Sequence, residues 1–249
     1  EMKIHCISDT HTKHREIELP GGDVLIHAGD IMSKDDPGQL IDFLVWFDEQ
    51  KYTTKLFIAG NHDHIFENKP DLIEKILRLF PSLIYLQDSE VIIDDIKFYG
   101  SPWIPTNFSG KAFSFLRTDH DIATKHWSKI PDDTDVLITH GPVYEKLDKI
   151  MHPVRENQTK LNLGDPSLGE RIKEINPQVH ICGHIHSGQG VLDEHEETTT
   201  YINAASLGED YQYSNKRRYI ECEILKTTSE IGLQRNGTQL TIGKQGQVN

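Results

Sequence analysis

Residues 182–188 read CGHIHSG and place His184 and His186 one residue apart, between two glycines. In an extended segment, residues i and i+2 point to the same side, so the two imidazoles can be directed at one ion. The neighbouring glycines allow the backbone to turn tightly and to approach a bound group closely. The stretch therefore predicts part of a metal site, and the remaining ligands must come from elsewhere in the chain.

The stretch follows a short apolar run, and four other runs of the same kind precede it. Runs rich in Ile, Val and Leu are typical of buried strands, and they lie at 3–8, 24–28, 55–59, 136–139 and 179–182. Because ligands bind beyond the carboxyl ends of strands in an α/β sheet, the turns after these runs predict one shared site. The turns contain Asp9, His11, Asp30, Asn61, His62, Asp63, His140, His184 and His186.

The side chains in these turns are nitrogen and oxygen donors, without a thiolate. Asp9 and His11 are spaced like the two histidines of the 182–188 stretch and can be directed at one ion. Asp30 can span two cations with its two carboxylate oxygens, and Asn61 adds a ligand oxygen without negative charge. Such a mixed set favours Mn, Fe, Zn or Ni over Mg or Ca, which prefer oxygen ligands.

Amphipathic helices separate several of the strands. Apolar residues recur at helical spacing over 35–50, 68–80, 119–130 and 165–176. Residues 90–100 predict a hairpin that turns at Asp94 and Asp95, and 201–203 and 218–225 predict later antiparallel strands. This order indicates a mixed-sheet α/β domain. We assign residues 2–226 to this single domain and 227–249 to a polar C-terminal extension, either an edge strand with a loose end or a tail.

Composition narrows the class of function. The net charge of −13 argues against stable nucleic-acid binding, because such proteins concentrate Lys and Arg against phosphates. No apolar run approaches the ~20 residues of a membrane span, and the N-terminal residues do not resemble a signal peptide. Cys6, Cys182 and Cys222 are widely spaced, as is typical of reduced thiols. We therefore expect a cytoplasmic protein without a membrane segment, whose oligomeric state the sequence leaves open.

The turns also resemble a known family. D-x-H at 9–11, GD at 29–30, GNHD at 60–63, H at 140 and GHIH at 183–186 follow the order seen in the calcineurin-like metallophosphoesterase superfamily, over residues 5–188. YGSPWIP at 99–105, DVLITHGP at 135–142, GHIHSGQG at 183–190 and TTTYINAAS at 198–206 resemble its MPPED-type branch, the class III cyclic-nucleotide phosphodiesterases. The resemblance implies an α/β fold, a four-layer α/β/β/α sandwich of two mixed β-sheets flanked by helices.

The resemblance also implies two divalent or trivalent metal ions, which we expect to be manganese, iron or zinc. Carried over residue by residue, it assigns the first ion to Asp9, His11, Asp30 and His186. It assigns the second ion to Asp30, Asn61, His140 and His184. Asp30 is then expected to bridge the two ions.

The expected reaction follows from these assignments. Two cations about 3.5–4 Å apart lower the pKa of a water between them, and the resulting hydroxide attacks phosphorus in line. His62 resembles the family histidine that assists the departing oxygen, an effect of about 10²–10⁴ in rate. Asp63 is expected to orient His62 by accepting a hydrogen bond from its ring. The sequence thus predicts a phosphodiesterase that hydrolyses a cyclic nucleotide or similar small phosphoester.

Two further residues are candidates for substrate binding. Trp103 can wall the pocket and stack on a base, or it can fill the core. Asn203 follows a late strand and can approach the site. Segment 143–171 departs from the MPPED-type pattern and can form a loop near the pocket, where inference from relatives is weakest.

Three alternatives remain open on the same fold. A phosphomonoesterase or protein phosphatase uses the same metal ligands, because the pocket walls decide the leaving group. A non-catalytic scaffold, like the retromer subunit of this fold, tends to lose ligands, whereas every position is filled here, including His184, where some MPPED-type members carry glycine. A DNA-repair nuclease is disfavoured by the acidic charge.

Overall fold

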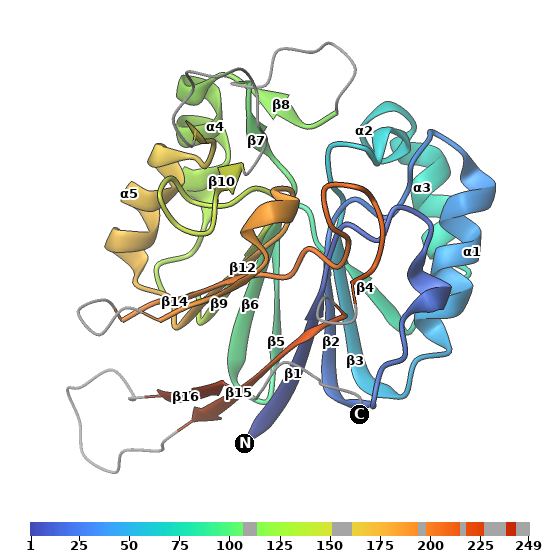
Figure 1. Cartoon of the computed structure of the whole chain (residues 1–249), viewed down its shortest axis with the longest axis horizontal. Coiled ribbons are helices and arrows are strands. Elements are labelled where there is room, and N and C mark those ends of the chain that lie inside the picture. The colour runs from blue at the N-terminus through green and yellow to red at the C-terminus, as the bar shows by residue number, and fades with distance from the viewer. Residues whose placement is uncertain (107–113, 151–160, 194–197, 215–217, 227–237, 243–249) are drawn as a thin grey trace.

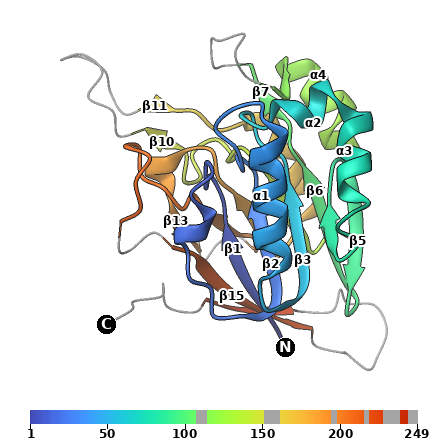
Figure 2. The same cartoon turned by 90° about the vertical axis from the view of Figure 1, so that its right-hand side faces the viewer.

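The structure is a computed structural model that describes residues 1–106, 114–150, 161–193, 198–214, 218–226 and 238–242. Its two six-stranded sheets lie face to face, with helices on both outer sides (Figure 1). Figure 2 shows the helices that cover the outer face of one sheet. The predicted α/β fold of two mixed sheets flanked by helices is thereby confirmed. None of the helices in the described ranges combines the length and the apolar composition that a membrane span requires.

The first sheet has the strand order β16-β15-β1-β2-β3-β4. Its parallel strands are β1 (Met2–Ile7), β2 (Gly22–Ala28), β3 (Tyr52–Ile58) and β4 (Leu83–Tyr85). Antiparallel to these, β15 (Ile220–Lys226) pairs with β1, and β16 (Thr238–Ile242) pairs with β15 at the edge. The edge strand β16 belongs to the 227–249 extension, of which 227–237 and 243–249 lie outside the described residues.

The second sheet has the order β13-β14-β12-β9-β6-β5. Its parallel strands are β6 (Ile96–Ser101), β9 (Val136–Thr139), β12 (Val179–Cys182) and β14 (Thr200–Asn203). The antiparallel strands are β5 (Ser89–Ile93) and β13 (Gly190–Leu192). The antiparallel strand predicted at 201–203 is antiparallel to β13, whereas its parallel pairing with β12 was not predicted. Because β13 reverses the chain direction between β12 and β14, β14 returns parallel to β12.

Shorter elements lie between the main strands. Two-stranded ladders join β7 (Ile104–Pro105) to β8 (Leu116–Arg117) and β10 (Lys149–Ile150) to β11 (Leu161–Asn162). Single 3-10 turns form η1 (His14–Glu16), η2 (Trp127–Lys129) and η3 (His186–Gly188). The β10 strand belongs to the 143–171 segment that departs from the family pattern, and residues 151–160 of that segment lie outside the described residues.

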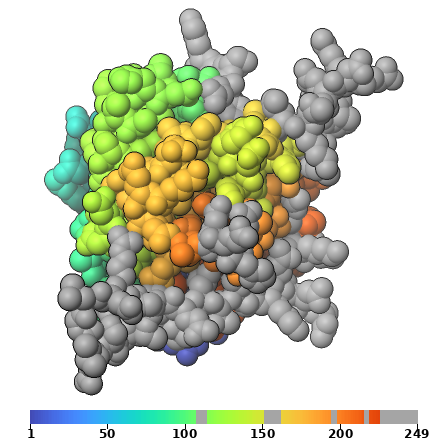
Figure 3. All heavy atoms as spheres, turned by 90° about the vertical axis from the view of Figure 1, so that its left-hand side faces the viewer, coloured from blue at the N-terminus to red at the C-terminus, as the bar shows by residue number. Residues whose placement is uncertain are grey.

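The helices form the outer layers. On the first sheet lie α1 (Pro37–Asp48), α2 (His64–Asn68) and α3 (Pro70–Leu77) (Figure 1). On the second lie α4 (Asp119–Lys125) and α5 (Pro166–Ile175), whose outer surface faces the viewer in Figure 3. Local signals set their ends: the Asp36 and Asp165 side chains cap α1 and α5, each before a proline in the first turn. Asn176, with φ of 52°, ends α5.

Successive side chains of a strand point to opposite faces of its sheet. The apolar side chains of the strands therefore form one layer between the two sheets and one layer on the outer face of each sheet. Ile4, Ile26 and Ile181 belong to the cluster between the sheets. Leu25 and Phe57, which point the other way, pack with the apolar stripe of α1. The apolar runs of the sequence thus correspond to strands that are covered on both faces.

The carboxyl ends of strands from both sheets meet at one edge of the sandwich. Ser8, just after β1, forms a parallel bridge with Ala205, just after β14. The Ser206 backbone N–H also donates to the Ser8 carbonyl at 2.8 Å. This connection fixes the turns of the first sheet against those of the second, and the residues predicted from those turns gather there.

Candidate metal centre and active site

Asp30 lies between two clusters of side chains that can hold metal ions. Its Oδ2 atom lies 3.8 Å from His11 Nε2, and its Oδ1 atom lies 3.4 Å from His140 Nε2. One cluster comprises Asp9, His11 and His186, and the other comprises Asp30, His140 and His184, with the ligand atoms of each within 4.8 Å of one another. The expectation that His184 and His186 are directed at one ion is therefore wrong, because the backbone at His184 is not extended but has a φ of 67°. A carboxylate that faces a cluster with each oxygen has the geometry of a bridging ligand.

Asn61 joins the second cluster. Its Oδ1 atom lies 2.9 Å from His140 Nε2, and the Asn61 side chain is buried. The structure therefore brings together all seven residues that the sequence predicts as metal ligands. They come from three turns that follow strands of the first sheet and two turns that follow strands of the second.

Backbone carbonyls determine which nitrogen of three histidines faces the clusters. The Nδ1 atoms of His11, His140 and His186 lie 3.2, 2.9 and 2.9 Å from the carbonyl oxygens of Met32, Ala28 and Gly208. A carbonyl can only accept, so each Nδ1 carries the hydrogen. This arrangement leaves Nε2 as the ligand atom, as metal-binding histidines require.

Positive charge is favoured at both clusters. Burial alone would raise the pKa of Asp9, but the hydrogen bond and charge of His186 outweigh it and hold this pKa below its ordinary value. Burial also opposes the charge of Asp30, but His140 outweighs it and lowers the pKa. Burial lowers the pKa values of His140 and His186, but the neighbouring carboxylates outweigh burial and raise both pKa values to about 9. The paired carboxylates therefore attract cations to this buried place.

These residues fit a pair of metal ions. The Nε2 atom of His11 is buried and, among the described residues, has no hydrogen-bond partner. Leaving such an atom unsatisfied costs about 1–3 kcal/mol, and a cation bound there would remove that cost. The imidazole and carboxylate donors suit manganese, iron or zinc.

The backbone around the ligands is strained. Asp9, His11, Asp30 and His184 have φ values of 53°, 40°, 56° and 67°. Left-handed conformations cost non-glycine residues of order 1–3 kcal/mol each and persist where the surrounding structure holds them. Positive φ also occurs at other described residues, but its presence at four of the seven candidate ligands shows that the surrounding structure holds these ligand turns in place.

His62 lies at the open side of the clusters. Its side chain is 27% exposed, and its Nε2 atom lies 4.0 Å from Asp30 Oδ2. Its ring meets the His11 ring edge-on at 5.0 Å, and its backbone N–H donates to Asp30 Oδ1 at 2.8 Å. The side chain can therefore reach a group bound at the clusters.

Asp63 holds two ligand turns together. Its carboxylate accepts hydrogen bonds from the backbone N–H groups of Ile31, Met32 and Gly60 at 3.1, 2.9 and 2.8 Å. Burial, with Asp30 nearby, raises the pKa of Asp63 to about 7. The predicted hydrogen bond from the His62 ring to Asp63 stays a prediction.

Two buried histidines support residues next to the ligands. His27 Nε2 lies 2.9 Å from the hydroxyl of Thr10, between Asp9 and His11, and His180 Nε2 lies 2.7 Å from the hydroxyl of Thr139, next to His140. Burial lowers the pKa of both His27 and His180 to about 3, so both are neutral.

Trp103 lies in the core. It is 6% exposed, its indole N–H donates to Asp88 at 3.0 Å, and its ring stacks on His126 with 4.1 Å between centroids. Arg117 also lies over the ring, 4.0 Å from its centroid. Of the two alternatives for Trp103, these contacts support core packing, and a base could stack on it only by displacing them.

Asn203 also uses its side chain within the protein. Its Nδ2 donates to the carbonyls of Leu147 and Ile185 at 3.1 and 2.9 Å, and its Oδ1 accepts from Ala205 N–H at 3.1 Å. Because Ile185 separates His184 from His186, Asn203 approaches the site as expected. Its contacts, however, support the ligand turn and do not extend into the cavity.

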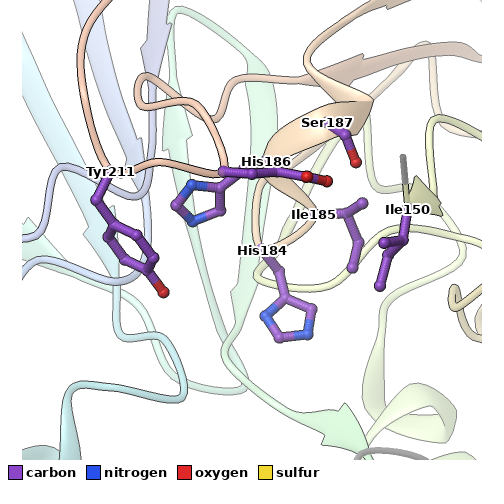
Figure 4. Close-up of a pocket in the computed structure, with 7 residues that line it drawn as sticks. Ile150, His184, Ile185, His186, Ser187 and Tyr211 are labelled. Carbon is purple, nitrogen blue, oxygen red and sulfur yellow. The ribbon is translucent and has the colours of Figure 1, made fainter. Parts of the chain in front are cut away.

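Tyr211 also lies beside the clusters, although it is not among the residues predicted from the sequence. Its ring lies 4.9 Å from that of His11 and 5.0 Å from that of His186, between centroids. It lines a cavity of about 200 Å³ beside His184 and His186, with Ile150 and Ile185 (Figure 4). No motif marks Tyr211, which lies in the polar stretch GEDYQYSN at 208–215.

Several curated proteins are similar to this chain in sequence. Metallophosphoesterase domain-containing protein 1 from Homo sapiens, and likewise that from Mus musculus, is 35% identical over 231 residues, which cover 84% of this chain and 68% of the relative. A UPF0046 protein from Caenorhabditis elegans is 32% identical over 231 residues, which cover 86% of this chain and 73% of the relative. The resemblance to the MPPED-type branch is thereby confirmed.

Solved structures share the fold. One crystal structure aligns with a TM-score of 0.64 at 16% identity, covering 97% of this chain and 98% of its own. The crystal structure of TT1561 of Thermus thermophilus aligns with a TM-score of 0.58 at 13% identity, covering 82% of this chain and 89% of its own. The calcineurin-like phosphoesterase family matches residues 2–188, the span that holds every candidate metal ligand. The chain belongs to the calcineurin-like phosphoesterase family.

Proposed function

We propose that this chain is a metal-dependent phosphodiesterase that acts on a small substrate, with cyclic nucleotides as the first candidates. The observation that carries the proposal is the position of Asp30, whose two oxygens face two separate histidine-containing clusters. A pair of bound metal ions supplies an activated water and neutralises charge on the phosphoryl group. Manganese, iron and zinc are the candidates, and Asp9, His11, Asp30, Asn61, His140, His184 and His186 are the proposed ligands.

His62 is proposed to hold the proton that the departing oxygen needs. Its partly exposed imidazole lies beside Asp30 and His11 and remains within reach of a substrate. The hydrogen bond from the His62 backbone N–H to Asp30 holds the loop that carries His62. The hydrogen bonds that the Asp63 carboxylate accepts from the backbone N–H groups of Ile31 and Gly60 hold the same loop. We assign Nε2 as the donating atom, because it is the ring nitrogen near Asp30.

The cavity beside the histidines favours a diester over a monoester. Its described lining contains no Lys or Arg, and it includes the acidic residue Glu209. A monoester carries up to two negative charges, whereas a diester carries one and has a second organic group to place. An acidic, partly apolar wall suits the diester better.

A substrate panel tests the proposal. Protein purified without chelator would be analysed for metal and assayed with 2′,3′- and 3′,5′-cyclic nucleotides, bis-p-nitrophenyl phosphate and p-nitrophenyl phosphate. We expect bound metal and a higher kcat/KM for the diesters. A preference for p-nitrophenyl phosphate would overturn the diesterase assignment in favour of a monoesterase, and metal-loaded protein inactive on the whole panel would favour a scaffold.

A further inference from the structure

We infer that the cavity between Tyr211 and the pair Ile150 and Ile185 is a subsite for an uncharged, ring-bearing ester group of the substrate. The inference rests on the proposed function, because it assumes that a phosphoryl group lies at the two clusters. The group attached to that phosphoryl group would then be an uncharged ring, and Tyr211 would be the residue that selects this ring.

The cavity opens directly onto the candidate metal ligands. His184 belongs to one cluster and His186 to the other, and both line the cavity. In the view of Figure 4, Tyr211 lies on one side of these imidazoles and Ile185 and Ile150 on the other. An organic group attached to a phosphoryl group at the clusters would therefore enter this space.

The walls of the cavity suit a flat apolar group. Tyr211 contributes an aromatic ring, and Ile150 and Ile185 contribute aliphatic side chains. Aromatic rings stack with other rings, and aliphatic walls exclude water from the remaining surface. The volume of about 200 Å³ is below the ~300–1,000 Å³ of pockets that enclose a whole ligand, so the cavity suits one part of a substrate.

Backbone contacts hold the Tyr211 loop in place. The Tyr211 carbonyl accepts a hydrogen bond from Lys13 Nζ at 2.8 Å, and its N–H donates to the Gly208 carbonyl at 2.9 Å. The same Gly208 carbonyl accepts from His186 Nδ1. Although Tyr211 is 44% exposed, its loop is tied to a candidate metal ligand and its ring contacts the rings of His11 and His186, so the ring is positioned before a substrate arrives.

Glu209 is expected to set the charge preference. This acidic residue belongs to the lining of the same cavity, and no described Lys or Arg belongs to it. A second anionic group on the substrate would add negative charge beside an acidic residue in a partly buried place, where like charges repel more strongly than in water. An uncharged ring avoids that repulsion.

Non-hydrolysable phosphonates test the subsite by binding alone. Isothermal titration calorimetry of metal-loaded protein would compare phenylphosphonate with methylphosphonate, which share the phosphonate group and differ in the ring. We expect wild-type protein to bind phenylphosphonate about 10-fold more tightly, the ratio expected from one stacked ring. Equal affinities would overturn the inference.

Variants of Tyr211 assign the preference to its ring. Tyr211→Phe should keep the preference, and Tyr211→Ala should reduce it to about one. Tyr144→Ala is the matched control, because Tyr144 is 42% exposed and lies outside the lining of this cavity. An unchanged preference in Tyr211→Ala, with metal content equal to that of wild type, would show that Tyr211 does not form the subsite.

A charged probe tests the role of Glu209. Wild-type protein should bind 4-carboxyphenylphosphonate several-fold more weakly than phenylphosphonate, and Glu209→Gln should remove most of that difference. The same discrimination in both proteins would overturn the charge preference. Turnover without any ring preference would overturn the subsite alone, whereas a ring preference without turnover would overturn the proposed function and leave the subsite intact.

Discussion

The imidazole of His180 donates a hydrogen bond from Nε2 to the hydroxyl of Thr139, across 2.7 Å. The direction follows from the hydroxyl itself: its single hydrogen points to the Gly141 carbonyl at 2.7 Å, so it can only accept from His180. The other ring nitrogen, Nδ1, is buried and has no hydrogen-bond partner among the described residues. Protonation of His180 would therefore place an unpaired charge in the core.

This relationship predicts a pH-dependent stability. Burial lowers the pKa of His180 to about 3 in the folded protein, from 6.5 when unfolded. Below pH 6.5 the unfolded chain binds a proton that the folded protein does not, so stability is lost as the pH falls toward 3. The slope for one such group is about 1.4 kcal/mol per pH unit.

A variant that cannot titrate isolates this contribution. His180→Gln retains a donor that can reach Thr139 and removes the titration. Urea unfolding of the metal-free wild type and variant at pH 7.5, 6 and 4.5 should show the wild type losing more stability over the acidic interval. Parallel pH profiles would show that His180 does not titrate as its surroundings imply.

Asp30 is predicted to be required for the two ions to be bound at the same time. Asp30→Asn removes the negative charge and leaves one amide oxygen where two carboxylate oxygens face His11 and His140. We expect the variant to lose at least one of the two ions, measured by inductively coupled plasma mass spectrometry on folded protein. Asp133→Asn is the control, because Asp133 pairs with Lys97 on the surface. Full metal content in Asp30→Asn would exclude a bridging role.

His62 is predicted to affect turnover and not metal content. His62→Ala should reduce kcat by about 10²–10⁴, the usual contribution of a positioned proton donor, while the metal analysis matches wild type. His64→Ala is the control, since His64 begins α2 two residues further on and belongs to neither cluster. Comparable kcat in His62→Ala with full metal content would remove His62 from the mechanism.

The strands that position the site could be predicted because their side chains are apolar on both faces. The runs at 136–139 and 179–182 match β9 and β12, and the three N-terminal runs differ from β1, β2 and β3 by up to three residues at their ends. The hairpin turn at Asp94 and Asp95 was also predictable, and both residues have positive φ. Polar residues directly after such runs then indicated the site.

Other features depend on contacts that no local pattern records. The ladders β7–β8 and β10–β11 have two residues per strand, too few for a periodicity to appear. The direction of β14 follows from the reversal at β13, which side-chain alternation does not encode. Tyr211 reaches His11 and His186 only because the loop after β14 folds back over them.

Gly183 is predicted to be irreplaceable because Asp9 and Ser8 leave no space for a side chain at this position. A methyl group at Gly183 would overlap the Asp9 carboxylate and the Ser8 hydroxyl. Neither can move freely, since Asp9 accepts from the His184 N–H and from Ser8 Oγ. Gly183→Ala should therefore displace Asp9, lower the metal content and cost about 1–3 kcal/mol of stability. In Gly38→Ala, the added methyl would meet only the exposed Asp36 side chain, at 3.2 Å, so this control should keep its metal. Wild-type metal content and stability in Gly183→Ala would mean that Asp9 is not confined as the structure indicates.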